Sequence, residues 1–208
     1  MPSASSGSSR ILVVATGNPG KVRELSALLA GIPFEIRTLA DYPGFVMPEE
    51  TGTTYEANAL IKARAAAAHT RELSLGDDSG IEVAALGGKP GVRSARFGGP
   101  GLDDRGRVAH LLQLIDAVPD AERAARFVCV IALVAPNGSE TLVEGVCEGQ
   151  ITRTPRGPEG FGYDPVFYYP PLGATFGELA DERKAAVSHR GRAAAAAKAA
   201  LQRVDQTP

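Results

Sequence analysis

The chain has 208 residues, which fits one domain or one domain with two lobes and is long enough to bury a core. Hydrophobic residues make up 44% and charged residues 22%, ordinary values for a soluble globular protein. A formal net charge of −2 argues against broad binding of nucleic acid, although a local basic pocket is compatible with it. No apolar run reaches the length of a membrane span. Residues 1–9 lack the apolar core of a signal peptide, so we expect a disordered lead-in there.

Residues 10–15 (RILVVA) form a short, β-branched apolar run that predicts a buried strand. A glycine-rich turn follows at 16–21 (TGNPGK), and a helix with an apolar stripe begins directly after it. A turn between a strand and a helix N-terminus can offer backbone N–H groups to an anion. The turn is not a P-loop, because the spacing of its glycines is too short and Val22 replaces the required Ser or Thr. A plain strand–helix connection with an exposed Lys21 is the alternative.

Residues 34–39 predict a second strand, and 41–52 predict a loop. Thr53 and Glu56 match a capping box, which predicts an alanine-rich helix running to about His69.

Asn58 and Lys62 lie one turn apart on this predicted helix and therefore share a face. Such a face is usually solvated. Glu50 stands just upstream, so a polar cleft shared by the three side chains is the other interpretation.

The short apolar run at 73–76 ends in Asp77, Asp78, Ser79 and Gly80, and a second apolar run starts at Ile81. We expect a corner here, at the carboxyl end of a strand, where ligands bind in open α/β sheets. Adjacent carboxylates suit Mg²⁺, which takes one or two carboxylates and completes its shell with water and phosphate oxygens. An ordinary turn is the competing interpretation, because Asp, Ser and Gly are common in turns.

The remaining predicted elements follow in chain order. They are a loop at 86–91, an amphipathic helix at 102–118 with Val108, Leu111, Leu112 and Ile115 inward, a hairpin of strands 126–135 and 141–151, a strand at 166–169, and a final alanine-rich helix to about Arg203, with residues 205–208 as a frayed tail.

The two cysteines both fall in the predicted hairpin. If residues 137–138 centre a tight turn, Cys129 lies opposite Val146 and Cys147 opposite Val128, with the thiols on opposite faces of the sheet. That geometry disfavours a disulfide and favours a reduced, cytoplasmic protein. The scattered histidines and cysteines show no zinc-ligand spacing.

Several acidic and basic residues cluster beside glycines or loop ends. The acidic ones are Glu49, Glu50, Asp77 and Asp78, and the basic ones are Lys21, Lys62, Lys184 and Arg190. Carboxylates can hold a cation while lysines and arginines neutralise phosphate oxygens, so the set suits a metal-bound polyphosphate. No G-x-S-x-G elbow is present, and neither cysteine has the polar loop setting of a nucleophile.

With these residues assembled, the chain resembles the inosine triphosphate pyrophosphatase family, the non-canonical purine nucleoside triphosphate pyrophosphatases. The resemblance runs in family order from Ile11 to about Leu201. The matching stretches are residues 16–21 (TGNxGK), residues 50–52 (ETG) with Asn58-Ala59 and Lys62-Ala63, residues 77–80 (DDSG), residues 86–91 (LGGxPG), residues 94–96 (SAR), residues 161–165 (FGYDP), and Lys184 with residues 188–190 (SHR). Arg183 beside Lys184 is a position at which family members vary.

The resemblance implies an elongated mixed α/β sheet with two lobes, in a single domain at 10–204, around a nucleotide cleft. It also implies a homodimer and Mg²⁺-dependent hydrolysis of ITP, dITP and XTP to the monophosphate and pyrophosphate. By position, Asp78 would be general base and metal ligand, Glu50 a second metal ligand, and Asp77, Asn58 and Lys62 supporting residues. The substrate would contact Thr16, Gly17, Asn18, Pro19, Gly20, Lys21, Ser79, Phe161, Gly162, Tyr163, Asp164, Lys184, His189 and Arg190.

A donor such as His189 or Arg190 aimed at the 6-oxo group of the base would separate hypoxanthine from adenine, which carries a 6-amino donor there. Guanine shares the 6-oxo group, so its exclusion requires crowding or desolvation at the 2-amino group. Two alternatives remain open at this point. One is a pyrophosphatase of similar fold for modified pyrimidine nucleotides, and the other is a nucleotide-sensing module that binds without cleaving.

Overall fold

The computed structural model describes residues 10–205. The predicted lead-in at 1–9 and the end of the predicted tail at 206–208 lie outside the described residues, while Asp205 is the last residue of a helix. A mixed seven-stranded sheet in the order β2-β1-β3-β4-β5-β6-β7 carries the fold, which confirms the predicted class. The strands are β1 Ile11–Ala15, β2 Glu35–Thr38, β3 Leu73–Val83, β4 Ala124–Val134, β5 Glu140–Ile151, β6 Phe167–Tyr169 and β7 Ala174–Thr175. The helices are α1 Pro19–Leu28, α2 Tyr55–Thr70, α3 Asp104–Leu114, α4 Asp181–Val187 and α5 His189–Asp205.

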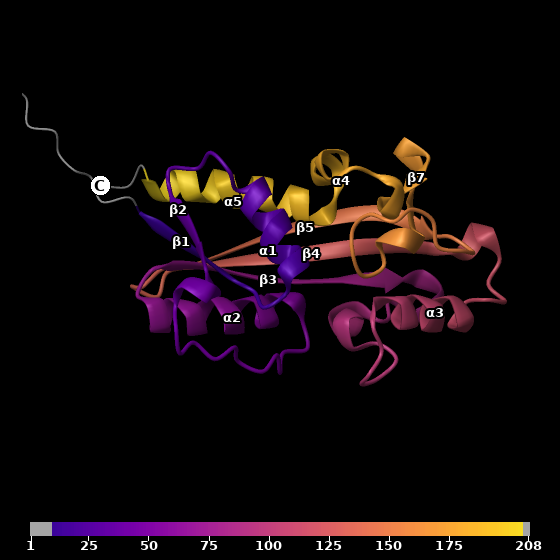
Figure 1. Ribbon diagram of the computed structural model, residues 1–208, viewed down its shortest axis with the longest axis horizontal. Helices are drawn as coiled ribbons and strands as arrows, with labels where there is room; N and C mark the ends of the chain where they lie inside the picture. The colour runs from indigo at the N-terminus through magenta and orange to yellow at the C-terminus, as the bar shows by residue number, and fades with distance from the viewer. Residues whose placement is uncertain (1–9, 206–208) are drawn as a thin grey trace, which may run out of the picture.

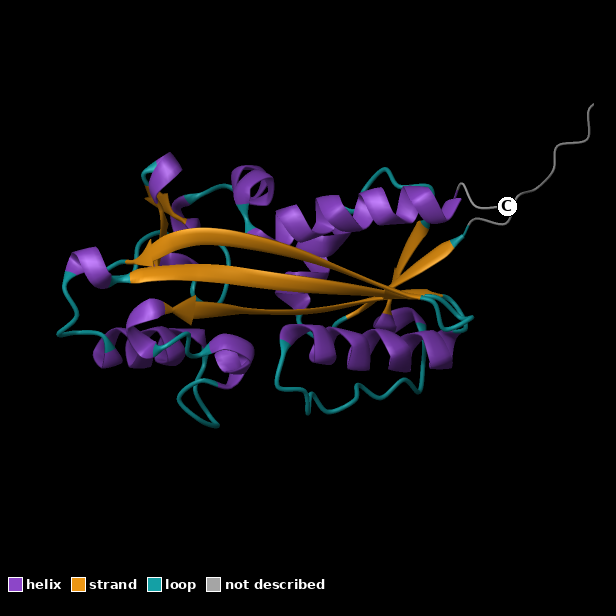
Figure 2. Ribbon diagram, turned by 180° about the vertical axis from the view of Figure 1, so that it is seen from behind, coloured by secondary structure: helices purple, strands orange, loops and turns teal. Residues whose placement is uncertain are grey.

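Three long strands give the molecule its elongated shape. Figure 1 shows β3, β4 and β5 running along the longest dimension, with α1, α4 and α5 over one face of the sheet and α2 and α3 over the other. The view from behind shows the same two layers of helices (Figure 2). Because both faces are covered, β1 and β4 are apolar and buried along nearly their whole length. No helix in the described range is long and apolar enough to cross a membrane.

The two carboxylates lie in the middle of a strand, so the predicted corner at Asp77 is wrong. Strand β3 continues through them to Val83, and antiparallel pairing sets Asp77 opposite Ile131 and Asp78 opposite Val130 of β4. On the other side of β3, parallel β1 ends at Ala15, opposite Gly76. From Asp77 onward, β3 therefore has no β1 residue beside it on this edge. The strand whose carboxyl end lies next to the two carboxylates is β1, not β3 as predicted.

The predicted register of the hairpin is wrong by one residue. The N–H of Ala135 donates to the carbonyl of Ser139, so the loop holds three residues instead of two, with Gly138 in the left-handed region at φ 86°. Cys129 consequently faces Gly145, and Cys147 faces Phe127. Both thiols then point to the same face of the sheet. They are nevertheless free, and burial raises the pKa of Cys129 to about 12 and that of Cys147 to about 11.

The helix boundaries also differ from the sequence expectation. Thr54, not Thr53, caps α2, because its side chain accepts the N–H of Ala57. Helix α3 starts after Asp103, whose side chain accepts the N–H of Gly106, and it ends at Leu114, before the predicted 118. A separate helix, α4, precedes the predicted C-terminal helix.

Two glycines allow helices to approach the sheet closely, one on each face. A Cβ at Gly76 of β3 would lie 2.3 Å from the carbonyl oxygen of Ala59 in α2. A Cβ at Gly145 of β5 would lie 2.1 Å from the carbonyl oxygen of His189 in α5. Real Cβ atoms do not come this near to backbone, so both positions require glycine. These contacts seat α2 and α5 directly on the strands.

Candidate active site

Two adjoining cavities lie beyond the carboxyl end of β1. We call the first, of about 100 Å³, the aromatic cavity; it is lined by Asn18, Lys21, Ser79, Gly80, Ser94, Ala95, Asp104, Arg107, Phe127, Phe161, Gly162, Tyr163, Asp164, Lys184, His189 and Arg190. We call the second, of about 250 Å³, the acidic cavity; it is lined by Thr16, Gly17, Asn18, Lys21, Met47, Glu50, Lys62, Asp78, Ser79, Val92 and Ala95. Asn18, Lys21, Ser79 and Ala95 line both, so the cavities meet along this row.

Asp78 lines the acidic cavity, where two hydrogen bonds hold its carboxylate. Its Oδ2 accepts from Asn58 Nδ2 at 3.0 Å and its Oδ1 accepts the N–H of Ser79 at 2.9 Å. Burial raises the pKa of this carboxyl, and the nearby Glu50 acts in the same direction, although Lys62, Lys21 and Asn58 oppose them. A carboxylate with a raised pKa inside a cavity is suited to accept a proton.

Glu50 and Asp78 converge on one ammonium group. Lys62 Nζ lies 2.5 Å from Glu50 Oε1 and 3.8 Å from Asp78 Oδ1. Asn58 links the same two regions, since its Oδ1 accepts the N–H of Gly52 while its Nδ2 donates to Asp78. The cleft shared by Asn58, Lys62 and Glu50 is therefore present, and the alternative of a solvated face is wrong, because Asn58 and Lys62 are buried.

Asp77 lies beneath the cavities and lines neither of them. Its side chain is fully buried, with Oδ2 at 2.8 Å from Lys21 Nζ and 3.9 Å from Arg190 Nε. Burial alone would raise the pKa of Asp77, but the charges of Lys21, Lys62 and Arg190 outweigh it and hold the pKa below its ordinary value. Asp77 is thus an anion that organises three cations.

The glycine-rich turn forms the N-terminus of α1. Asn18 caps that helix, and its Oδ1 accepts the N–H groups of Gly20 at 2.8 Å and of Lys21 at 3.2 Å. The side chain of Asn18 therefore occupies part of the anion site that was predicted from the backbone N–H groups of this turn. The first N–H groups of a helix have no partner within the helix and need an acceptor. Pro19 starts the helix and lines neither cavity, whereas Lys21 is held near both by Asp77.

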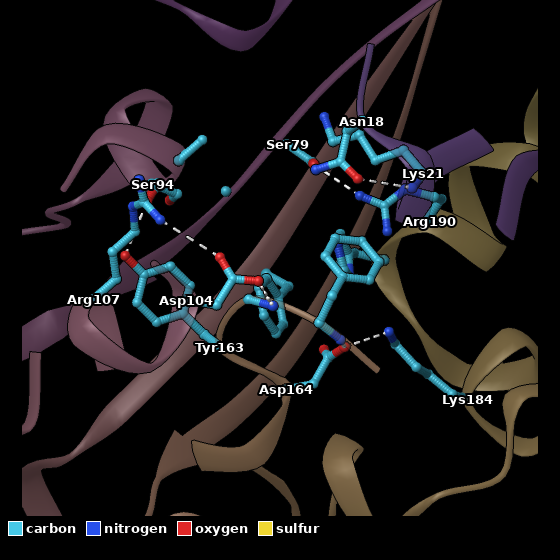
Figure 3. Close-up of a pocket in the computed structure, with 16 residues that line it drawn as sticks. Asn18, Lys21, Ser79, Ser94, Asp104, Arg107, Tyr163, Asp164, Lys184 and Arg190 are labelled. Carbon is cyan, nitrogen blue, oxygen red and sulfur yellow. Dashed lines mark hydrogen bonds and ion pairs between the residues drawn. The ribbon is translucent and has the colours of Figure 1, made fainter. Parts of the chain in front are cut away.

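Aromatic rings form the floor of the aromatic cavity. His189 stacks on Phe127 with ring centroids 4.5 Å apart and an interplanar angle of 9°. Its Nδ1 is buried without a hydrogen-bond partner among the described residues, and burial together with neighbouring cations lowers its pKa well below 6.5. Tyr163 donates from its hydroxyl to the carbonyl of Ser94 at 2.9 Å, which closes one wall (Figure 3).

A buried charge network borders the same cavity. Lys184 Nζ donates to Asp164 Oδ2 and to Glu24 Oε1, both at 2.6 Å. Arg190 donates to the other oxygen of Glu24 and, at 2.8 Å, to Ser79 Oγ. Burial favours the neutral amine of Lys184, but the two carboxylates outweigh it and raise its pKa. Both cations are thus charged and fixed before any ligand arrives.

The structure therefore brings nearly all of the predicted site residues together, and it adds several that the sequence did not indicate. These are Glu24, Asp104, Arg107 and Phe127, while Ser94 belongs to the matching stretch 94–96 but had been given no role. Glu24 follows Lys21 by three residues on α1, and this spacing was the only signal available for it. Asp104 accepts the N–H of Gly162 across 58 positions of the chain, which no local pattern indicates.

The donor set fits a hard divalent cation only in part. No group of three or more metal-ligating side chains occurs within the described residues. Glu50 and Asp78 nevertheless direct two carboxylates at one positive centre, the ammonium of Lys62. Mg²⁺ bound with a polyphosphate needs no more than one or two carboxylates. The site thus fits this ion in the company of a substrate.

Fold and site together form a cleft whose fixed cations suit a phosphorylated ligand, with a carboxylate of raised pKa in one of its two adjoining cavities. A model of the Ham1 family matches residues 12–200. The chain is 52% identical to a dITP/XTP pyrophosphatase of Desulforamulus reducens over 88% of this chain and 90% of that protein. It is 51% identical to a dITP/XTP pyrophosphatase of Thermus thermophilus over 88% and 87%.

Solved structures agree with the sequence relatives. A HAM1 protein from Coxiella burnetii matches with a TM-score of 0.85 and 40% identity, covering 93% of this chain and 99% of that one. A nucleoside-triphosphatase / dITP/XTP pyrophosphatase from Mycobacterium abscessus matches with a TM-score of 0.71 and 46% identity, covering 89% and 96%. The chain belongs to the Ham1 family, and the resemblance drawn from its motifs is confirmed.

Proposed function

We propose that the protein hydrolyses non-canonical purine nucleoside triphosphates (ITP, dITP and XTP) to the monophosphate and pyrophosphate. The observation that carries the proposal is the position of Asp78, a carboxylate of raised pKa in the cavity that adjoins the aromatic one. A base held in the aromatic cavity and a triphosphate extending into the acidic cavity would pass the shared row that includes Lys21 and Ser79. Relatives that are about half identical are named for dITP and XTP.

The chemistry is a hydrolysis at the α-phosphorus. Asp78 accepts a proton from water, and the water oxygen forms the new bond to the α-phosphorus. The bond between the α-phosphorus and the oxygen that bridges it to the β-phosphorus breaks, and pyrophosphate leaves. Mg²⁺, when bound by Glu50 and Asp78, would neutralise phosphate charge and lower the barrier to attack. Asn58 orients the Asp78 carboxylate through its hydrogen bond at 3.0 Å.

Cations that are already fixed in the site neutralise the negative charge of the leaving pyrophosphate. Lys21 and Lys62 stand at the acidic cavity, while Arg190 and Lys184 border the aromatic one. The network of Glu24 and Asp164 holds the last two in place, so little side-chain entropy is lost on binding. Thr16, Gly17 and Asn18 complete the contact surface for the phosphates.

The base is read from the floor and walls of the aromatic cavity. His189, neutral because of its lowered pKa, stacks on Phe127 and keeps a ring nitrogen unpaired among the described residues. The Phe161 ring lies beside the cations, with Lys184 Nζ 5.0 Å and Arg190 Cζ 5.5 Å from its centroid. Because Arg190 is engaged by Glu24 and Ser79, His189 is the better of the two predicted readers of the 6-oxo group.

We further infer a cytoplasmic homodimer, with residues 10–204 acting as one two-lobed domain and without nucleic acid or membrane as partners. The continuous sheet from β1 to β7 supports the single domain, and the slightly negative net charge argues against nucleic acid as a partner. The homodimer and the cytoplasmic location are the expectations that the resemblance and the unpaired cysteines gave. Sedimentation of the purified chain tests the dimer directly.

A nucleotide panel assayed with Mg²⁺ tests the function. We expect IMP and pyrophosphate from ITP without accumulation of IDP, and loss of turnover in EDTA that added Mg²⁺ restores. Stoichiometric IDP and orthophosphate would rule out cleavage at the α-phosphorus. Faster turnover of modified pyrimidine nucleotides than of ITP would favour the related pyrimidine activity, and binding without cleavage would favour a sensing module.

A further inference from the structure

Arg107 is a charged residue in the wall of the aromatic cavity. It comes from the second turn of α3, and its side chain is 19% exposed. Its Nη1 lies 3.6 Å from Asp104 Oδ1, which is an ion pair beyond hydrogen-bond distance. Its Nε is buried and has no hydrogen-bond partner within the described residues. The guanidinium group therefore has donor capacity that a ligand in the cavity could use.

The position of Arg107 separates it from the phosphate-binding cations. Figure 3 shows Arg107 and Asp104 across the cavity from Asn18, Lys21 and Arg190. Asp104 is fixed there, because its Oδ2 accepts the N–H of Gly162 at 2.9 Å. A nucleotide whose phosphates lie at Lys21 would therefore place the far side of its base, the pyrimidine ring of the purine, toward Arg107.

We propose that Arg107 is a specificity-determining residue that reads the C2 position of the purine and thereby favours xanthine and excludes guanine. This inference rests on the proposed function. A guanidinium group carries five donors and no acceptor. Xanthine presents a carbonyl oxygen at C2, hypoxanthine presents only hydrogen there, and guanine presents an amino donor.

The three bases therefore meet Arg107 differently. The xanthine oxygen gains a charge-assisted hydrogen bond, whereas hypoxanthine neither gains nor loses one. The guanine amino group sets a donor against a donor, so neither group gains a hydrogen bond from the other inside the cavity, which is costly. Arg107 thus supplies a physical reason for guanine exclusion in addition to crowding or desolvation.

The experiment compares kcat/KM for XTP, ITP, dITP and GTP in Arg107→Ala, with Arg105→Ala as the matched control. Arg105 is an exposed arginine on the same helix and lines neither cavity. We expect Arg107→Ala to lower the XTP to ITP ratio roughly 10- to 100-fold and Arg105→Ala to leave it unchanged. Ratios taken on one preparation are unaffected by a partly unfolded sample.

A second variant tests whether Arg107 disfavours guanine. In Arg107→Gln the amide oxygen can accept from the 2-amino group, so the GTP to ITP ratio should rise by roughly threefold or more. An XTP to ITP ratio within about threefold of wild type in Arg107→Ala overturns the inference. A change confined to the ITP to dITP ratio also overturns it, because it would assign Arg107 to the ribose. Wild-type protein that cleaves neither ITP nor XTP would instead refute the proposed function.

Discussion

The ammonium nitrogen of Lys21 lies 2.8 Å from Oδ2 of Asp77, a carboxylate with no exposed surface. Arg190 Nε approaches the same oxygen at 3.9 Å, and Lys62 adds to the positive field. One buried anion therefore balances three cations that the proposed reaction requires close together. Asp77 thus has an electrostatic and structural setting, whereas the role proposed for its neighbour Asp78 is chemical.

Replacing Asp77 tests this balance. Asp77→Asn should lower the free energy of unfolding by roughly 3–5 kcal/mol, because it leaves buried cations without their counter-charge. Urea unfolding measures the change. Asp120→Asn is the matched control, since Asp120 pairs with Arg153 but its side chain is 79% exposed, and little change is expected there. Equal stability of the two variants would contradict the role given to Asp77.

Asp78→Asn should abolish turnover while nucleotide binding persists. An amide accepts a hydrogen bond but cannot take a proton from water near neutral pH, and loss of a general base costs roughly 10²–10⁴-fold in kcat. Binding should survive because Lys21, Lys184 and Arg190 are untouched. Pyrophosphate release and calorimetric ITP binding at saturating Mg²⁺ measure the two effects. A folded variant that keeps more than about a tenth of wild-type kcat would move the base elsewhere, first to Glu50.

His189→Ala should erode the preference for ITP over ATP. The loss of one hydrogen bond to a polar group is worth roughly 1–3 kcal/mol, about tenfold to a hundredfold in the ratio of kcat/KM values. Phe127→Leu is the control, since it removes the ring on which His189 stacks but leaves the imidazole in place. If both variants change the ratio equally, stacking and not hydrogen bonding distinguishes the bases.

Glu24→Gln should destabilise the protein in a pH-dependent manner. Burial would raise the pKa of Glu24, but Arg190 and Lys184 outweigh it and place the pKa below the ordinary 4.5. A lowered folded-state pKa contributes stability above 4.5, and that contribution is lost as the pH falls through the folded-state pKa.

The difference between wild type and Glu24→Gln should therefore be largest near neutral pH and narrow below about pH 4.5, as followed by urea unfolding. Glu35→Gln provides the comparison, because Glu35 pairs with Arg37 on the surface and is 48% exposed. A difference that stays constant between neutral and acid pH would show that the ion pairs of Glu24 do not stabilise the fold.

Local patterns predicted the elements well and their pairing less well. The apolar run before the glycine-rich turn, the alanine-rich helices and the hairpin were all visible in sequence, because each repeats a period within a few residues. The continuity of β3 through Asp77 and Asp78 was not visible, since Asp and Gly disfavour strands and only the distant β4 holds them extended. The hairpin register depended on one residue of loop length.

The site residues were also predictable from the sequence only in part. Motif residues such as Asp78, Lys184 and Arg190 could be identified because they recur in family order. Glu24 and Arg107 could not, because their roles arise from contacts with segments distant in the chain. Their side chains are chemically ordinary until the fold places them beside a cavity.

The two close-packing glycines have a consequence for how mutations in this protein would be interpreted. Gly76 seats the helix that bears Asn58 and Lys62, and Gly145 seats the helix that begins at His189. Any side chain at either position would push that helix away from the sheet and carry its polar groups out of alignment. A genetic screen for inactive alleles would therefore recover both glycines alongside the residues that touch substrate, although neither has a side chain to offer.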